Sequence, residues 1–462
     1  MSALSRSLIA AAGNVAGSVS YWVDKISIPD TTTYTLRLAH SEDREAVMIA
    51  ARSFGNKFRS VEVDWDGALL RATERTLSST FAPYSLTCVA NDGDYAVNYQ
   101  HGYSQNVIES VSTGTDTANF QSVSPWLYNY PNNFNNQNLN YYQTLSSDPN
   151  NASKVVYAWE GYYYYYYPPW DVTEPQAVFG RYDTSTRSAD FTSTSNMFGI
   201  IGYLEGKNAM ISSAPASGTN TWAGYCLTGA INWFYTYKSN TSSSQVTYRK
   251  KSGALGNSWG VGLFIDPSNF LCCVVGNSTT AEICRSQSGG SIGIPTTVTS
   301  ITLAGTWGVV QNAAMDSNGD LYILTSNMYL IKVTTANAID WVCKLEDTRV
   351  SAGATGSSPT RQVIIGNESE TDVLYIAAPM AYSPTYDWLL WKLPIDLPSY
   401  AGTYGTYYKI TEITSPLPTI STQAANTQSD APISTSTAAP SVTSPSTVQG
   451  TKKTPTISNT TI

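Results

Sequence analysis

The stretch Ala314–Leu345, AMDSNGDLYILTSNMYLIKVTTANAIDWVCKL, decides the fold of this chain. Its turn segment Asp316–Asp320 separates two apolar runs, and Tyr329–Val333 and Ile339–Leu345 follow. Runs of Val, Ile, Tyr and Trp bounded by Asp, Asn and Gly predict four consecutive strands joined by tight turns. Weaker versions of this unit recur along the chain, which indicates a repeat architecture.

Seven such units align at the start of their second strand, with spacings of about fifty residues, a period typical of β-propeller blades. We therefore expect an all-β chain of about seven four-stranded blades, with a solenoid as the alternative architecture. A helical fold is not expected, because no segment carries a sustained helical stripe of apolar residues. The aligned positions are Val47, Tyr95, Val155, Ala209, Leu271, Leu321 and Val373.

The composition divides the chain into three expected regions. These are an N-terminal anchoring segment (residues 1–19), the β-propeller (20–415) and an extended tail rich in Ser, Thr and Pro (416–462). The tail has few large apolar side chains, so we expect it to become ordered only when a partner holds it.

A propeller must close its ring, and one terminus can supply a strand to the blade that the other terminus begins. The run Tyr21–Ile26 resembles Asp340–Leu345, which occupies an outer-strand position in its unit. We expect Tyr21–Ser27 to pair beside Tyr407–Ile413, which would hide a sheet edge. The alternative is that Tyr407–Ile413 completes the last blade alone and the first strand is a fifth, outermost one.

Charge and hydropathy exclude several function classes. Charged residues make up 13% of the chain and the formal net charge is −8, while the densest basic run is Arg249–Lys251. Phosphate contacts require clustered Lys and Arg, so we expect no nucleic-acid partner. No apolar run approaches the roughly twenty residues that span a bilayer. The N-terminus also lacks a signal-peptide core, so neither membrane insertion nor classical secretion is expected.

Catalytic and metal-binding patterns are missing from the sequence. The six cysteines have no metal-ligand spacing, and we expect most of them to be buried thiols. His40 and His101 are the only histidines, and neither a GxSxG turn nor the Asp-box pattern of propeller sialidases is present. Asp316–Asp320 matches the opening of a calcium loop but lacks the bidentate Glu, which favours a hairpin turn. We expect no metal, no cofactor and no enzymatic activity.

The strongest local anomaly is the run Gly161–Trp170, GYYYYYYPPW. Six consecutive tyrosines cannot all be buried on one strand, because alternation turns three of them toward water. Turns between second and third strands lie at the same end of a propeller as the connections between blades, and several Tyr-rich segments fall in these positions. Flat rings with amides and hydroxyls suit sugar binding. The alternative is that the rings pack between loops as local cores. The candidate ligand-binding residues are Tyr99, His101, Tyr103, Trp126, Tyr128, Tyr130, Phe134, Tyr162, Tyr163, Tyr164, Tyr165, Tyr166, Tyr167, Trp170, Tyr382 and Tyr386.

The repeat resembles the bacterial β-propeller repeat family. Units of that family run Asp-x-x-Gly-Asn-hydrophobic-Tyr, then a strand ending near Lys, then a strand containing Trp. Met315–Tyr322 with Lys332 and Trp341 matches this pattern best, and the likeness extends over most of residues 20–415. Such chains with a short Ser-Arg-Ser-Leu-Ile-Ala-Ala-Ala-like N-terminal segment are similar to virion proteins of marine tailed phages.

The resemblance implies a structural virion protein, tail-associated or a fibre component, present in multiple copies on the particle surface. Residues 1–19 and the C-terminal tail would anchor it to other virion proteins, and a host surface glycan is the expected ligand. Two alternatives remain open: a non-viral lectin or protein-interaction propeller, and a propeller hydrolase acting on polysaccharides. The fold alone does not choose among them.

Overall fold

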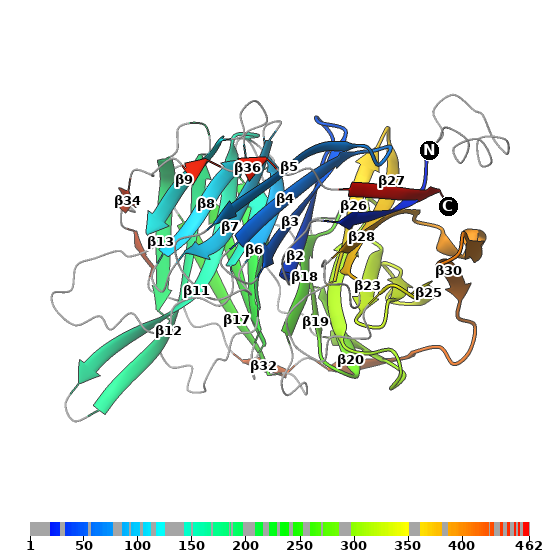
Figure 1. Cartoon of the computed structure of the whole chain (residues 1–462). Coiled ribbons are helices and arrows are strands. Elements are labelled where there is room, and N and C mark those ends of the chain that lie inside the picture. The colour runs from blue at the N-terminus through cyan, green and yellow to red at the C-terminus, as the bar shows by residue number, and fades with distance from the viewer. Residues whose placement is uncertain are drawn as a thin grey trace.

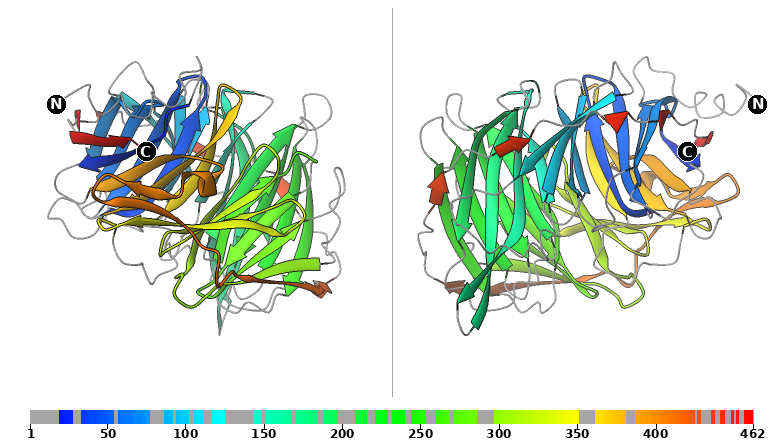
Figure 2. Two further views of the ribbon diagram at one scale, coloured as in Figure 1. Left: turned by 90° about the vertical axis from the view of Figure 1, so that its right-hand side faces the viewer. Right: turned by 60° about the vertical axis from the view of Figure 1, so that its left-hand side comes forward.

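The computed structural model arranges antiparallel strands in sheets around a central axis (Figure 1, Figure 2). Among the residues it describes there is no α-helix, and a single 3-10 turn, η1, spans Leu397–Tyr400. The described residues are 19–27, 33–53, 57–76, 86–91, 94–101, 105–111, 117–124, 143–148, 151–167, 170–183, 185, 188–196, 208–215, 221–228, 232–239, 244–252, 259–268, 271–285, 297–350, 361–380, 387–424, 426–428, 435–437, 441–443, 448–449, 451–452 and 456–461.

Seven sheets each contain four antiparallel strands in up-and-down order. They are blade 1 with β2 (Thr33–Ser41), β3 (Ala46–Ser53), β4 (Lys57–Asp64) and β5 (Leu69–Thr76); blade 2 with β6 (Leu86–Asn91), β7 (Asp94–His101), β8 (Gln105–Val111) and β9 (Thr117–Ser124); blade 3 with β10 (Gln143–Ser147), β11 (Lys154–Tyr167), β12 (Trp170–Asp183) and β13 (Ser188–Asn196); blade 4 with β14 (Asn208–Pro215), β15 (Thr221–Thr228), β16 (Asn232–Ser239) and β17 (Ser244–Ser252); blade 5 with β18 (Trp259–Ile265), β19 (Leu271–Gly276), β20 (Thr280–Arg285) and β21 (Thr297–Thr302); blade 6 with β22 (Val310–Met315), β23 (Leu321–Thr325), β24 (Tyr329–Val333) and β25 (Ile339–Asp347); and blade 7 with β26 (Gln362–Glu368), β27 (Thr371–Pro379), β28 (Trp388–Pro394) and β1 (Trp22–Ser27).

The first strands of successive blades contact one another around the axis. The series runs from β2 through β6, β10, β14, β18 and β22 to β26, which contacts β2 again. The ring is therefore closed, and the chain is a seven-bladed β-propeller, as the repeat predicts. Buried Val, Ile, Leu, Tyr and Trp side chains fill the spaces between neighbouring blades.

Blade 4 corrects one position of the repeat alignment. Six of the seven aligned residues lie in second strands, whereas Ala209 lies in β14, the first strand of its blade. The second strand, β15, begins only at Thr221. The segment between them, Ala216–Asn220, has no Asp-x-x-Gly turn, so spacing alone placed the unit one strand too early.

Ring closure uses the N-terminal strand, but with a different partner from the expected one. Strand β1 pairs along its length with β28 and becomes the fourth strand of blade 7. The segment Tyr407–Ile413 instead contains β30 (Tyr408–Glu412), which adds to β25 of blade 6. The reason is that β26–β28 provide only three strands before the chain turns into η1. Blade 7 therefore lacks an outer strand, which β1 supplies.

The segment after Pro416 forms a belt around the propeller. We use "belt" for the strands that follow β30, each of which pairs antiparallel with the outer strand of a blade. They visit the blades in reverse order, from blade 5 back to blade 1 and then blade 7, where β37 pairs with β1. The belt strands are β31 (Thr419–Ala424), β32 (Asn426–Gln428), β33 (Thr435–Thr437), β34 (Ser441–Thr443), β35 (Val448–Gln449), β36 (Thr451–Lys452) and β37 (Thr456–Thr461).

Strand β31, the belt strand whose side chains the structure describes in part, is held chiefly by its backbone. In β31, Thr419, Ser421 and Thr422 are exposed, and even Ile420 keeps 37% of its surface accessible. The pairing of β31 with β21 nevertheless extends over six residues. We expected an external partner to order this segment. In the structure the segment pairs instead with blade edges of the same chain, which supply the hydrogen-bonding groups.

Candidate functional site: the aromatic end of the propeller

Strand direction sorts the turns of each blade onto two ends of the disc. Because neighbouring strands are antiparallel, turns between second and third strands lie at the same end as the connections from one blade to the next. Strands β7, β9, β11 and β27 all end there, and each candidate ligand-binding residue lies near one of these strand ends or follows it in the sequence. We call this end the aromatic end.

The tyrosine run forms the tip of the longest hairpin. Strands β11 and β12 each contain 14 residues and pair up to Tyr167 opposite Trp170. The neighbouring strands are shorter: β10 reaches only Trp159 on β11, and β13 reaches only Gln176 on β12. The six tyrosines therefore lie on a two-stranded ribbon, Tyr162–Pro175, which projects from blade 3 (Figure 1, lower left).

Register divides the ribbon into two faces, because residues directly opposite each other on paired strands share a face. Three pairs, Tyr163 with Glu174, Tyr165 with Val172 and Tyr167 with Trp170, alternate along the ribbon with the other three. The latter are Tyr162 with Pro175, Tyr164 with Thr173 and Tyr166 with Asp171. Each face thus carries three tyrosines and one carboxylate residue, and neither face continues into a neighbouring strand of the blade.

The structure places only part of the remaining candidate set. Tyr99 and His101 lie in the last residues of β7, and His101 pairs with Gln105 across the turn to β8, at the aromatic end. The other candidates lie outside the described residues: Tyr103, Trp126, Tyr128, Tyr130, Phe134, Tyr382 and Tyr386.

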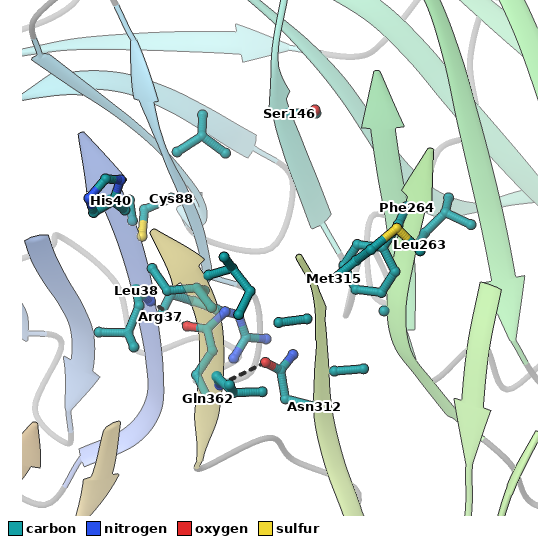
Figure 3. Close-up of a pocket in the computed structure, with 18 of the residues that line it drawn as sticks. Arg37, Leu38, His40, Cys88, Ser146, Leu263, Phe264, Asn312, Met315 and Gln362 are labelled. Atoms are coloured by element: carbon teal, nitrogen blue, oxygen red, sulfur yellow. Dashed lines mark hydrogen bonds between the residues drawn. The ribbon is translucent and has the colours of Figure 1, made fainter. Parts of the chain in front are cut away.

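A central cavity of about 520 Å³ lies on the propeller axis, lined by first strands (Figure 3). A first strand has an unpaired edge there, and side chains of adjacent blades satisfy some of its backbone groups. Asn312 donates from Nδ2 to the Val261 carbonyl at 3.0 Å and accepts the Val363 N–H at 2.9 Å. Gln362 Oε1 accepts the Leu38 N–H, and the Ser147 hydroxyl donates to the Ala90 carbonyl at 2.6 Å. These contacts hold the ring together.

His40 borders the same cavity and acts in packing. Its ring stacks on Trp65 with a centroid distance of 5.8 Å and also contacts Tyr375. Burial lowers the pKa of His40 to about 4, and the nearby Lys392 charge contributes. A neutral ring suits this aromatic stack. Gly366 faces the ring so closely that a Cβ there would lie 2.5 Å from it.

The described residues contain no cluster of three or more His, Cys, Asp or Glu side chains that could hold a metal ion. Five cysteines are buried free thiols, as expected: Cys88, Cys272, Cys273, Cys284 and Cys343. Burial raises the pKa of Cys88, Cys272 and Cys343 to about 12. No helix in the described part of the chain has the length and apolar character needed to cross a membrane.

The sequence did not indicate a hollow in blade 6 at the aromatic end. It lies beside the turn between β23 and β24 and the segment that follows β25, and its volume is about 320 Å³. Asn327, Tyr329 and Lys344 line it, and Trp307 stacks beneath Tyr329. The sequence signal was weak, because Trp307 and Tyr329 lie 22 positions apart in the sequence and become neighbours only in the folded blade.

Comparison with known proteins gives fold-level matches alone. No protein-family model matches the chain, and no curated protein matches it. Among solved structures, Raptor of Chaetomium thermophilum has 8% identity and a TM-score of 0.47, covering 82% of this chain and 30% of that one. BBS1N, solved in complex with ARL6DN, has 9% identity and a TM-score of 0.42, covering 82% and 99%. The Dos1 propeller has 9% identity and a TM-score of 0.42, covering 81% and 95%.

Proposed function

We propose that the chain is a non-enzymatic structural protein of a tailed-phage particle, mounted on the particle surface and binding a host surface glycan through its aromatic end. The repeat and N-terminal segment resemble such virion proteins. The absence of catalytic patterns from the sequence and the polar, weakly charged composition also support this assignment.

One observation carries the proposal: strands β1 and β37 lie on the opposite side of the ring from the tyrosine ribbon. Strands β1 and β37, nearest the two ends of the chain, are neighbours in blade 7. The tyrosine ribbon belongs to blade 3, and blades 3 and 4 are the farthest from blade 7 in the ring order. Figure 1 has the N and C labels on the right and the ribbon at lower left. A chain anchored by its ends would hold the ribbon away from the anchor.

Aromatic residues on both faces of a ribbon that neighbouring strands do not flank suit contact with pyranose rings. Replacing Tyr162–Tyr167 together by serine should remove this stacking surface while leaving the blade itself paired from Lys154 to Glu160. We expect binding to a glycan array of bacterial surface polysaccharides to fall by at least about tenfold, since several stacking contacts are lost at once.

The matched control is Tyr407→Ser, which removes a tyrosine that is 52% exposed and lies between β29 and β30. Glycan binding should survive this substitution. Unchanged array binding by the six-serine variant would refute a role for the ribbon, and turnover of any bound polysaccharide would favour the hydrolase alternative. Detection of the native protein only as a free monomer, never in particles, would refute the virion role.

A further inference from the structure

We propose that the hollow in blade 6 is a second ligand site, which takes one neutral sugar ring of the same glycan. This inference rests on the proposed function, since it extends the aromatic end beyond the ribbon. Three segments at that end form the hollow: Thr306 from the connection before β22, Ser326–Tyr329 at the β23–β24 turn, and Lys344–Thr348 with Val350 from the end of β25 and beyond. Its volume of about 320 Å³ lies at the small end of ligand sites, which run from roughly 300 to 1,000 Å³.

A stacked pair of aromatic rings gives the hollow a rigid wall. The rings of Trp307 and Tyr329 are 4.6 Å apart and nearly parallel, at 4°. Trp307 is buried, whereas Tyr329 is only half-buried. Gly308 fixes the Trp307 corner, because it has φ +79° and a Cβ there would collide with the Ser326 hydroxyl. That hydroxyl accepts the Val309 N–H at 3.0 Å.

Opposite charges above the ring provide both donors and acceptors. Lys344 Nζ lies 5.5 Å from the centre of the Tyr329 ring and 3.3 Å from Glu346 Oε1. Burial acts to raise the pKa of Glu346, but hydrogen bonds from Thr411 and Lys344 outweigh it and the pKa is lowered. An ammonium donates only and a carboxylate accepts only, so together they can serve the hydroxyls of a sugar. Their charges cancel, which favours a neutral ring over an acidic one.

The floor of the hollow contains a strained residue. Met328 has φ +62°, in the left-handed region that costs a non-glycine residue roughly 1–2 kcal/mol. Its N–H donates to the Thr325 carbonyl at 3.0 Å, and its carbonyl accepts the Leu345 N–H at 2.9 Å. These bonds tie the β23–β24 turn to the end of β25, and strain of this kind is concentrated at ligand sites.

The test uses the full chain and saturation-transfer NMR with glucose, galactose and N-acetylglucosamine as separate probes. We expect transfer to at least one of these neutral sugars with half-saturation in the range of about 1 mM, as is ordinary for a single weak site. Lys344→Ala should weaken it by at least about tenfold, because a hydrogen bond to a charged group is lost. The ring of Tyr329 would remain in place.

Lys409→Ala is the matched control. Lys409 pairs with the same carboxylate, at 3.4 Å from Glu346 Oε2, but does not line the hollow. Its removal should change the affinity by less than about twofold, as for an exposed ion pair. Absence of transfer to all three sugars would overturn the proposal, and so would equal transfer by the wild type and Lys344→Ala. Tighter binding of glucuronate than of glucose would overturn the assignment of a neutral ring.

Failure of this site would be distinguishable from failure of the proposed function. If array binding is lost on replacing Tyr162–Tyr167 but Lys344→Ala has no effect, the ribbon stands and the hollow is refuted. If neither change affects array binding while the wild type still binds glycans, both assignments are refuted.

Discussion

At the scale of single residues, Asp24 on β1 is a titratable group that is buried in the core without a hydrogen-bond partner for its carboxylate oxygens. It is fully buried between β28 and β37, where its register neighbours are Leu390 and Asn459. Neither carboxylate oxygen has a hydrogen-bond partner. Burial raises the pKa of Asp24 to about 8, and the charge of Asp64 adds to the effect. The carboxyl group is therefore protonated at neutral pH in the folded state.

This pKa predicts that stability falls as pH rises. Between about pH 4, where an unfolded aspartate titrates, and about pH 8, the folded state holds a proton that the unfolded state has lost. Folding is therefore favoured at the acidic end of this window. Asp24→Asn should flatten this dependence. At pH 9 it should stabilise the protein by more than about 1.4 kcal/mol, the free energy that corresponds to one pKa unit. Urea unfolding of the wild type and the variant at pH 5, 7 and 9 measures the free energy of unfolding.

Asp66→Asn is the control for Asp24, because Asp66 is exposed and its carboxylate accepts the Ser20 hydroxyl at 3.1 Å. It should alter stability by less than about 0.5 kcal/mol at every pH, as surface substitutions usually do. If Asp24→Asn leaves the pH dependence of stability equal to that of the wild type, the buried carboxyl does not titrate as described.

At the scale of elements, the β22–β23 hairpin of blade 6 depends on one turn aspartate. Asp316 Oδ1 accepts the N–H groups of Asn318 and Asp320, both at 2.9 Å, and Oδ2 accepts the Tyr322 hydroxyl at 3.0 Å. Gly319 supplies the positive φ, +86°, that the turn requires. Both carboxylate oxygens thus accept hydrogen bonds within the hairpin, which agrees with the expected turn rather than a calcium loop.

Asp316→Ala should destabilise the propeller by about 2–3 kcal/mol, because the buried Tyr322 hydroxyl and two turn N–H groups lose their acceptor. Equilibrium urea unfolding measures the change. Asp340→Ala is the matched control: its ion pair with Lys332, at 3.1 Å, is 45% exposed on the Asp340 side, so the loss should stay below about 1 kcal/mol. Equal effects of the two substitutions would contradict this role for the turn.

The elements that the sequence predicted are those with a strong local signal. In Ala314–Leu345, turn chemistry and strand residues agree, and all four strands appear in the structure. The likeness of Tyr21–Ile26 to Asp340–Leu345 correctly predicted an outer strand, since β1 and β25 are both fourth strands of their blades. Blade 4 was misplaced because its first turn lacks that chemistry. The hollow in blade 6 was missed because distant residues form it.

The belt was missed for a different physical reason. Pairing at an outer edge needs backbone groups and little apolar burial, so Thr419–Thr461 carries no hydrophobic pattern that would predict strands. A composition rich in Ser and Thr indicates a disordered segment when that segment is considered alone. The six blade edges that order it form only when the ring is folded.

At the scale of the whole molecule, the belt protects the propeller's rim. The described outer strands β1, β5, β9, β13, β17 and β21 all have a belt strand beside them, and exposed edges of this kind template pairing between molecules.

A chain ending at Pro416 should keep β30 on blade 6 but leave those six edges open. We expect it to fold, to unfold about 5 °C or more below the full chain, and to associate as its concentration rises. Light scattering and thermal unfolding over a concentration series measure both effects. Leu417→Ser in the full chain removes a leucine that is 49% exposed while keeping the belt, and should leave the protein monodisperse. A shortened chain as monodisperse and heat-stable as this control would contradict a protective role, because the six outer edges would then be stable without the belt strands.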